Sequence, residues 1–385
     1  MDARGDYGGA VTLSEDVVSV ISEALDIQRI RQYFNSAVVA RSVYEGVRAD
    51  AGLLNKLRRG LVPLPMDSSP QPEDPFPAKR ARPVAALQDR RVAVVATGGS
   101  GALACVVGAA RALEEAGVRP SGYGLCSGSA LFGVPLAAGL STDETARFVL
   151  HLRPPDYIEP DWAGLLAMPL RLGRGWSGLL SGDRLERTYR ELLGDITLGE
   201  LDVPVWLPFW NIETNRLHYI GPDTHPDLSA ARAVRMAVAL PVGMQANPLD
   251  GGWWLDGGIV DILPAQPFVD EDRCDLALVI NGFYPKGFDS PREPDWREHR
   301  FSLLHIASQA RLMQHLRIAR RSLDDLRASV DQVVLVEPVP YETVHGAGLY
   351  TQFFDTRDWG SFMAMGHRET IRMLSELDSS TVGVA

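Results

Sequence analysis

Tyr123-Gly-Leu-Cys-Ser-Gly-Ser-Ala-Leu-Phe-Gly133 changes from a strand pattern to a helix pattern at one serine, and this change is the strongest indication of the fold. Small residues follow Ser127, an apolar run with helical character extends to Ala138, and Gly139 ends it. A serine on such a sharp turn is held out above the sheet, where its hydroxyl can act as a nucleophile. We therefore expect Ser127 to lie between a buried strand and a helix.

A second strand–turn–helix unit precedes this one. Residues 91–97 form a short β-branched apolar run, which is typical of a strand buried on both faces. A glycine-rich turn follows, and residues 102–116 have helical spacing that Gly117 ends. The successive amides of the turn can point at a developing negative charge. We therefore predict an oxyanion hole formed by Gly98, Gly99, Ser100 and Gly101.

The same turn also fits the dinucleotide-binding fingerprint G-x-G-x-x-G/A, as Gly99-Ser-Gly101-Ala-Leu-Ala104. A dinucleotide site further needs a carboxylate at the end of the next strand, and a phosphate-binding P-loop needs a lysine after the turn. The chain has neither. Glycines that serve only close packing between strand and helix remain an alternative to the oxyanion hole.

Asp-Gly-Gly occurs twice in one late segment, starting at Asp250 and again at Asp256. Asp250 lies in a polar approach, and we interpret it as part of a turn. Asp256 follows a predicted strand at 253–255 and precedes an apolar run that Pro264 closes. A carboxylate at a strand end, with two flexible residues behind it, can be held close to a serine hydroxyl. We therefore predict Asp256 as the base for Ser127, with a plain hairpin turn as the alternative.

Strand patterns alternate with helix patterns along the rest of the chain. This alternation predicts an α/β fold with a largely parallel central sheet. Further strands are predicted at 203–210, 217–220, 276–280 and 332–336, and helices around 181–193, 229–239, 302–328 and 359–377.

Three regions are predicted along the 385 residues. Residues 1–62 have helical apolar spacing and a basic end, and form an N-terminal helical arm that either docks on a membrane or partner or caps the main domain. Residues 63–90 contain seven prolines and form a proline-rich linker. Residues 91–385 form the main α/β domain.

The composition excludes several classes of protein. A net charge of −11 disfavours nucleic acid as a partner. Three cysteines, an odd number, disfavour a disulfide framework and indicate a reducing, cytoplasmic compartment. Two long uncharged stretches, 92–110 and 120–142, are interrupted by glycine and serine, which disfavours a membrane span. No signal peptide is expected, and no metal or other cofactor, because no ligand cluster has metal-binding spacing.

Taken together, the glycine-rich turn, the serine elbow and the late Asp-Gly-Gly resemble the patatin-like phospholipase family in type and order. Residues 233–241 end in Ala-Leu-Pro and are similar to the family's helix ahead of the aspartate. Residues 256–264 are similar to its Asp-Gly-Gly…Pro signature, and residues 363–374 to its closing helix. The resemblance covers roughly residues 90 to 377.

This resemblance implies a three-layer fold, in which helices flank the sheet, and a lipid acyl hydrolase. Ser127 would be the nucleophile and Asp256 its direct base, a dyad without histidine, with the oxyanion hole at the glycine-rich turn. The substrate would be a lipid or another acyl ester, cleaved through an acyl-serine intermediate, and contact with a membrane surface is possible. The chain departs from the family at the elbow, where Leu125 and Ser129 replace glycines. At the upstream turn Ser100 replaces a glycine, and Ala102 and Leu103 stand where a cation is usual.

Three alternatives stay open at this point. An α/β-hydrolase triad would add a histidine, for which His305, His345 and His367 are available downstream. A protein that binds lipid or a partner, with an impaired catalytic apparatus, is suggested by the elbow departures. An acyltransferase would use the same acyl-serine.

Overall fold

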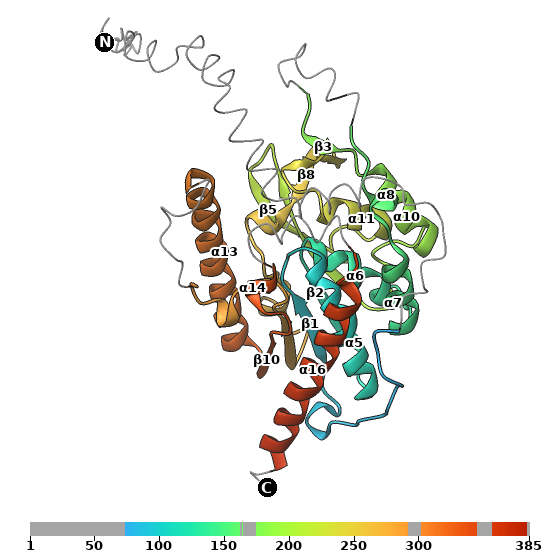
Figure 1. Ribbon diagram of the computed structural model, residues 1–385, viewed down its shortest axis with the longest axis vertical. Coiled ribbons are helices and arrows are strands. Elements are labelled where there is room, and N and C mark those ends of the chain that lie inside the picture. Colours follow the sequence, from blue (N-terminus) through green and yellow to red (C-terminus); the bar gives the residue numbers. More distant parts are fainter. Residues whose placement is uncertain (1–73, 162–163, 165–174, 292–301, 345–355, 383–385) are drawn as a thin grey trace, which may run out of the picture. The chain divides into compact units, whose positions relative to one another are not determined.

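The computed structural model describes residues 74–161, 164, 175–291, 302–344 and 356–382. These residues lie within one compact unit, and the predicted helical arm at 1–62 lies outside them. An eight-stranded sheet forms the centre of the unit, in the strand order β10-β9-β1-β2-β4-β8-β7, with β5 paired to β4 (Figure 1).

The first five strands of this order run parallel to one another, and the others are antiparallel. The parallel strands are β10 (Gln332–Val336), β9 (Leu276–Ile280), β1 (Val92–Ala96), β2 (Gly122–Leu125) and β4 (Val205–Asn211). The antiparallel strands are β8 (Gly252–Asp256), β7 (Asn247–Leu249) and β5 (Arg216–Ile220). A separate two-stranded parallel sheet joins β3 (Gly178–Leu180) to β6 (Val242–Met244).

The sheet is buried on both faces. Along β1, Val92, Val94 and Ala96 enter one apolar core, and Ala93 and Val95 enter the other. Helices α5 (Cys105–Glu115), α6 (Gly128–Ala137), α7 (Thr142–His151), α10 (Asp183–Leu193), α11 (Ala230–Ala237) and α16 (Trp359–Val382) contribute to the first core. Helices α12 (Gln266–Val269) and α13 (Ser302–Ser329) contribute to the second (Figure 1). The predicted three-layer α/β class is confirmed.

Most of the predicted elements are present within a few residues of their expected bounds. The strands expected at 276–280 and 332–336 are β9 and β10 without change. The short edge strand β7 is not among the predicted strands, and it contains Pro248. A proline is tolerated there since β7 pairs with β8 on one side only.

Helix α6 contains Pro135, and a neighbouring helix compensates for it. Proline has no amide hydrogen, so the Leu131 carbonyl, four residues earlier, loses its helical donor. The buried hydroxyl of Tyr189 in α10 donates to this carbonyl at 2.7 Å. The proline thus creates the acceptor that fixes α10 against the helix that follows Ser127.

The described part of the predicted linker, residues 74–90, lies against the main domain. Phe76 is buried in the first core, and the Arg82 amide donates to the Glu115 carbonyl at 2.7 Å. A short 3-10 helix, Ala85–Leu87, leads into β1. Among the described residues, no helix is long and apolar enough to cross a membrane.

Helices α5 and α16 approach each other so closely that glycine is required on both. A Cβ atom at Gly108 would lie 1.9 Å from the Met363 carbonyl oxygen, and one at Gly366 would lie 2.1 Å from the Cys105 carbonyl oxygen. Both obstacles are backbone atoms, which cannot rotate away. The two helices therefore pack through their backbones.

We predict that Gly108→Ala lowers the free energy of unfolding by about 1–3 kcal/mol or more, because the helices must separate to admit the methyl group. Urea denaturation followed by circular dichroism measures the change. Gly360→Ala, in the first turn of α16, is the matched control, since its nearest neighbour is the flexible Leu150 side chain at 3.3 Å. Equal stability of the two variants would contradict the close packing.

Candidate active site

Ser127 lies on a strained turn between β2 and α6. Its backbone has φ 50° and ψ −124°, a conformation that residues other than glycine rarely adopt. The side chain is buried, with 5% of its surface exposed. The next residue, Gly128, approaches the glycine-rich turn so closely that a Cβ atom there would lie 2.3 Å from the Gly99 carbonyl oxygen. The strain is therefore maintained by contact between the two turns.

Both departures at the elbow are accommodated by local contacts. The Ser129 hydroxyl accepts a hydrogen bond from the Cys126 amide and donates one to the Cys126 carbonyl, both at 2.8 Å. Leu125 projects toward Gly133, where a Cβ atom would lie 2.5 Å from Leu125 Cδ1. The leucine therefore uses the space that Gly133 leaves in α6, and the serine closes the turn.

The glycine-rich turn lies against the serine. A Cβ atom at Gly98 would lie 3.3 Å from the Ser127 Cβ. At Gly99 a Cβ would lie 2.4 Å from Leu103 Cδ2 and 2.7 Å from Phe283 Cβ, so a side chain does not fit there.

The hydrogen bond made by the Gly98 amide corrects the prediction that this amide belongs to the oxyanion hole. It donates to the Ile262 carbonyl at 2.9 Å, so it anchors the turn and is not available to a substrate oxygen. Sequence reasoning missed this bond because its acceptor lies far away in the chain. The roles expected for Gly99, Ser100 and Gly101 stay a prediction.

Asp256 ends β8 and is completely buried. Its amide donates to the carbonyl of Ala239, the first residue of the Ala-Leu-Pro sequence that follows α11, at 2.9 Å. Its carboxylate Oδ1 accepts from the Gly258 amide at 2.8 Å. Within the described part of the chain, Oδ2 has no hydrogen-bond partner of standard geometry.

Burial raises the pKa of Asp256 from 3.8 to about 7, while the Gly258 amide and the Ser127 hydroxyl oppose the rise. The hydroxyl is thus near enough to favour the ionised carboxylate. The structure therefore brings the two predicted site residues together. A carboxyl group with a pKa near neutrality beside a serine hydroxyl has the chemistry of a general base and its nucleophile.

The two glycines after Asp256 are both required by close packing. A Cβ atom at Gly257 would lie 2.5 Å from the Pro208 carbonyl carbon of β4, and one at Gly258 would lie 2.9 Å from the Cys126 sulfur. The turn therefore lies against Cys126, the residue between β2 and Ser127.

The other Asp-Gly-Gly is a turn, as predicted. Asp250 and Gly251 both have positive φ, 51° and 77°, and connect β7 to β8 as a two-residue hairpin loop. The Asp250 side chain is largely exposed and bonds His225 Nε2 at 2.9 Å.

The predicted histidine alternatives find no support in the described residues. His367 is buried between α5 and α16, with its Nε2 3.3 Å from a Glu115 carboxylate oxygen. Burial, as the largest cause, lowers its pKa. His345 lies outside the described residues, as does the side chain of His305.

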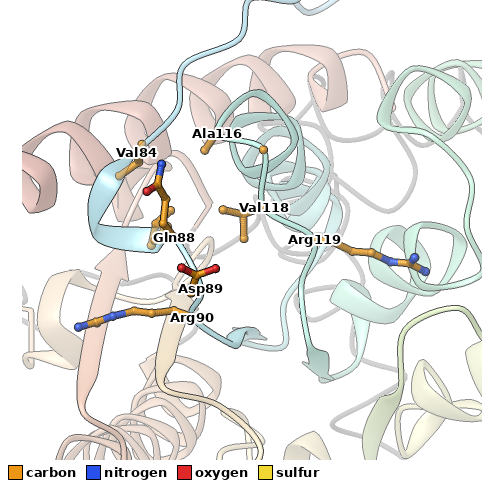
Figure 2. Close-up of a pocket in the computed structure, with 9 residues that line it drawn as sticks. Val84, Gln88, Asp89, Arg90, Ala116, Val118 and Arg119 are labelled. Carbon is orange, nitrogen blue, oxygen red and sulfur yellow. The ribbon is translucent and has the colours of Figure 1, made fainter.

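A pocket of about 330 Å³ lies at the end of the sheet opposite to Ser127. Val84 and residues 87–90, which precede β1, line it together with residues 116–119, which precede β2 (Figure 2). Ser127 and the glycine-rich turn instead follow these strands. Its two arginines bond to other parts of the protein, Arg90 to Gln332 and Arg119 to Asp202. Among the described residues, no group of three or more His, Cys, Asp or Glu side chains is arranged to hold a metal ion.

Comparison with known proteins identifies a domain. Residues 94–269 match the family model "Patatin-like phospholipase". Two curated relatives are patatin-like phospholipase domain-containing protein 6 of Mus musculus and the protein of the same name of Homo sapiens. Each is 28% identical to this chain over 172 residues, which cover 44% of this chain. The match spans 12% of the length of these relatives. Among solved structures, VipD from Legionella pneumophila is 15% identical with a TM-score of 0.41, over 78% of this chain and 71% of that one. The resemblance inferred from the sequence is confirmed over residues 94–269.

The raised pKa of Asp256 predicts a specific dependence of stability on pH. Between about pH 4 and pH 7 the unfolded chain releases this proton while the folded protein keeps it, so the contribution of Asp256 to the free energy of unfolding falls as pH rises. The full cost, roughly 4 kcal/mol, is present above pH 7. Asp256→Asn keeps an acceptor for the Gly258 amide but carries no charge. We therefore expect the stability of this variant, relative to the unmutated protein, to be greater at pH 8 than at pH 4.

Thermal unfolding at both pH values measures this difference. Asp250→Asn, the same change in the exposed Asp-Gly-Gly, is the control and should show no such trend. A relative stability of Asp256→Asn that does not change with pH would mean that the carboxylate titrates normally.

Proposed function

We propose that this chain, which carries a patatin-like phospholipase domain at residues 94–269, is a lipid acyl hydrolase that acts through a Ser127–Asp256 dyad. The observation that carries the proposal is the pairing of a strained, buried serine with a buried carboxylate whose Oδ2 has, among the described residues, no hydrogen-bond partner of standard geometry. A buried carboxylate without full hydrogen bonding costs stability, and such groups concentrate at functional sites.

The proposed reaction has two halves. Asp256 accepts the hydroxyl proton as Ser127 Oγ attacks the ester carbonyl, and the amides of the glycine-rich turn stabilise the oxyanion. Collapse of the tetrahedral intermediate expels the alcohol, which takes the proton, and leaves an acyl-serine. Water then attacks the acyl group with Asp256 again as the base. The fatty acid leaves and Ser127 regains its proton.

Asp256 can act at neutral pH because its pKa is about 7. A base works best when its pKa lies near the pH of the reaction, since it is then both available and strong enough to take a proton. Activity should therefore rise with pH through about 7, as the carboxyl group ionises.

We predict that Ser127→Ala and Asp256→Asn each lower kcat/KM for a soluble short-chain ester by at least about a thousandfold, because each removes one half of the dyad. The same screen should include long-chain esters and phospholipids, which define the substrate. Asp250→Asn and His225→Gln, which alter an exposed acid–histidine pair, should keep activity within about twofold.

A fluorophosphonate probe offers an independent measure of the same site. It should label the folded protein on Ser127 and fail to label Ser127→Ala. Absence of labelling in the unmutated protein would overturn the proposed hydrolase, and loss of activity in His305→Gln or His345→Gln would overturn the dyad.

The proposed lipid substrate gives a role to apolar side chains exposed beside Asp256. Leu240 and Val242 follow Ala239, whose carbonyl holds the Asp256 amide, and Val260 lies four residues after Asp256. Val242 is 71% exposed and has φ 69°, which is unusual for a β-branched residue. We assign to these three residues, the apolar rim, contact with a lipid surface at the periphery of a membrane. A cytoplasmic location stays a prediction from the cysteine count.

We predict that Val242→Ser lowers hydrolysis of ester lipid presented in vesicles several-fold and leaves hydrolysis of a soluble short-chain ester unchanged. The reason is that the substitution removes apolar area from the rim without touching the dyad. Met313→Ser, at an exposed apolar residue of α13, is the control surface change. An equal loss on both substrates would show that the rim acts on folding or chemistry instead.

A further inference from the structure

Asp261 lies where three segments of the site meet. Its amide donates to the Gly257 carbonyl at 2.9 Å, in the turn behind the proposed base. Its carbonyl accepts a hydrogen bond from the Cys126 thiol at 3.6 Å, in the residue before the proposed nucleophile. The next carbonyl, of Ile262, accepts from the Gly98 amide at 2.9 Å and anchors the glycine-rich turn. One short segment of backbone therefore holds all three parts of the site.

The Asp261 side chain fixes the direction of this backbone. Its Oδ1 accepts from the Leu263 amide at 3.1 Å, so the side chain closes a turn over the two carbonyls that contact the site. The same oxygen accepts from the Ser322 hydroxyl of α13 at 3.5 Å, and Oδ2 accepts from the Tyr219 hydroxyl of β5. Hydrogen bonds thus connect the Asp261 carboxylate to helix α13 and to strand β5.

The protonation states of Asp261 and Tyr219 favour the hydrogen bond between them. Burial raises the pKa of Asp261 to about 6, while the three donors from Tyr219, Leu263 and Ser322 oppose the rise. Burial, followed by the charge of Asp261, raises the pKa of the Tyr219 hydroxyl, which therefore keeps its proton and remains a donor. At neutral pH a neutral phenol faces an ionised carboxylate, which is the stronger kind of hydrogen bond.

We propose that Asp261 is a positioning residue, whose carboxylate, bonded to Tyr219, holds the serine elbow, the glycine-rich turn and the turn behind Asp256 in one arrangement. Its part in catalysis rests on the proposed function. Asp261 touches no reacting atom in this scheme. It acts through the backbone carbonyls of residues 261 and 262, and a shift of the elbow relative to the base slows proton transfer.

The test compares Asp261→Asn with Asp275→Asn. Asparagine at 261 keeps an acceptor for Leu263 but places an NH₂ group where Tyr219 needs an acceptor. Asp275 is a matched control, because its carboxylate accepts from the Arg91 amide at 2.8 Å beside the start of β1, at the opposite end of the sheet. The readouts are kcat and KM on a soluble ester, the unfolding midpoint, and hydrogen exchange of peptides that contain Gly98 and Cys126.

For Asp261→Asn we expect kcat to fall on the order of tenfold with KM within about twofold, as loss of alignment without loss of binding requires. Exchange should become faster in the peptides around Gly98 and Cys126. Asp275→Asn should leave kcat and this exchange as in the unmutated protein, whatever its effect on the unfolding midpoint. Unchanged kcat and exchange in Asp261→Asn would overturn the proposal.

Tyr219→Phe covers the case in which Asp261→Asn does not fold, since it removes a single donor and keeps the carboxylate. It should show a smaller change of the same kind, and unmutated values of kcat and exchange would overturn the proposal. The proposed hydrolase and the proposed positioning role of Asp261 can each be refuted without the other. An unmutated protein that hydrolyses no ester and takes no label on Ser127 refutes the hydrolase, whereas the hydrogen exchange still decides whether Asp261 positions the three segments.

Discussion

Burial of the Asp256 carboxylate is the constraint to which the rest of the site is fitted. A carboxyl group that is completely buried, with one oxygen bonded to the Gly258 amide, costs free energy in its ionised form. The fold keeps it in place from both sides, through the Ala239 carbonyl on its amide and through Gly257 packed on the backbone of β4. The packing that buries the carboxylate also determines where Ser127 and the glycine-rich turn lie.

The stability that offsets this cost comes from the layers around the sheet. Five parallel strands are covered on both faces, and α5 and α16 pack so closely that Gly108 and Gly366 admit no side chain. Glycine appears at the site for the same reason, since Gly128 touches the Gly99 carbonyl. The site therefore consists of backbone segments in direct contact, which leaves little freedom for its geometry to vary.

Much of this arrangement could be predicted from the sequence, because its signals are local. The runs at 276–280 and 332–336 are apolar and short, and Asp250-Gly251 is a hairpin dipeptide, so the strands and the turn follow from the residues themselves. The bond between the Gly98 amide and the Ile262 carbonyl could not be predicted, because it joins residues that only the fold brings together. The same holds for Leu125 and Gly133, where a large residue at one position is matched by an absent side chain at another.

Two departures from the family pattern, Ala102 and Leu103, fit the apolar surroundings in which they lie. Ala102 and Leu103 are completely buried, and Leu103 packs against Gly99, so a cation at either position would have to lie in the apolar core. A buried cation without a partner is costly, and apolar residues there are consistent with the packing of α5 beneath the turn. In the proposed reaction, stabilisation of the oxyanion then falls to backbone amides alone. The geometry of the glycine-rich turn matters for that proposed reaction, and it depends on the carbonyls of residues 261 and 262, which hold the turn and the elbow together.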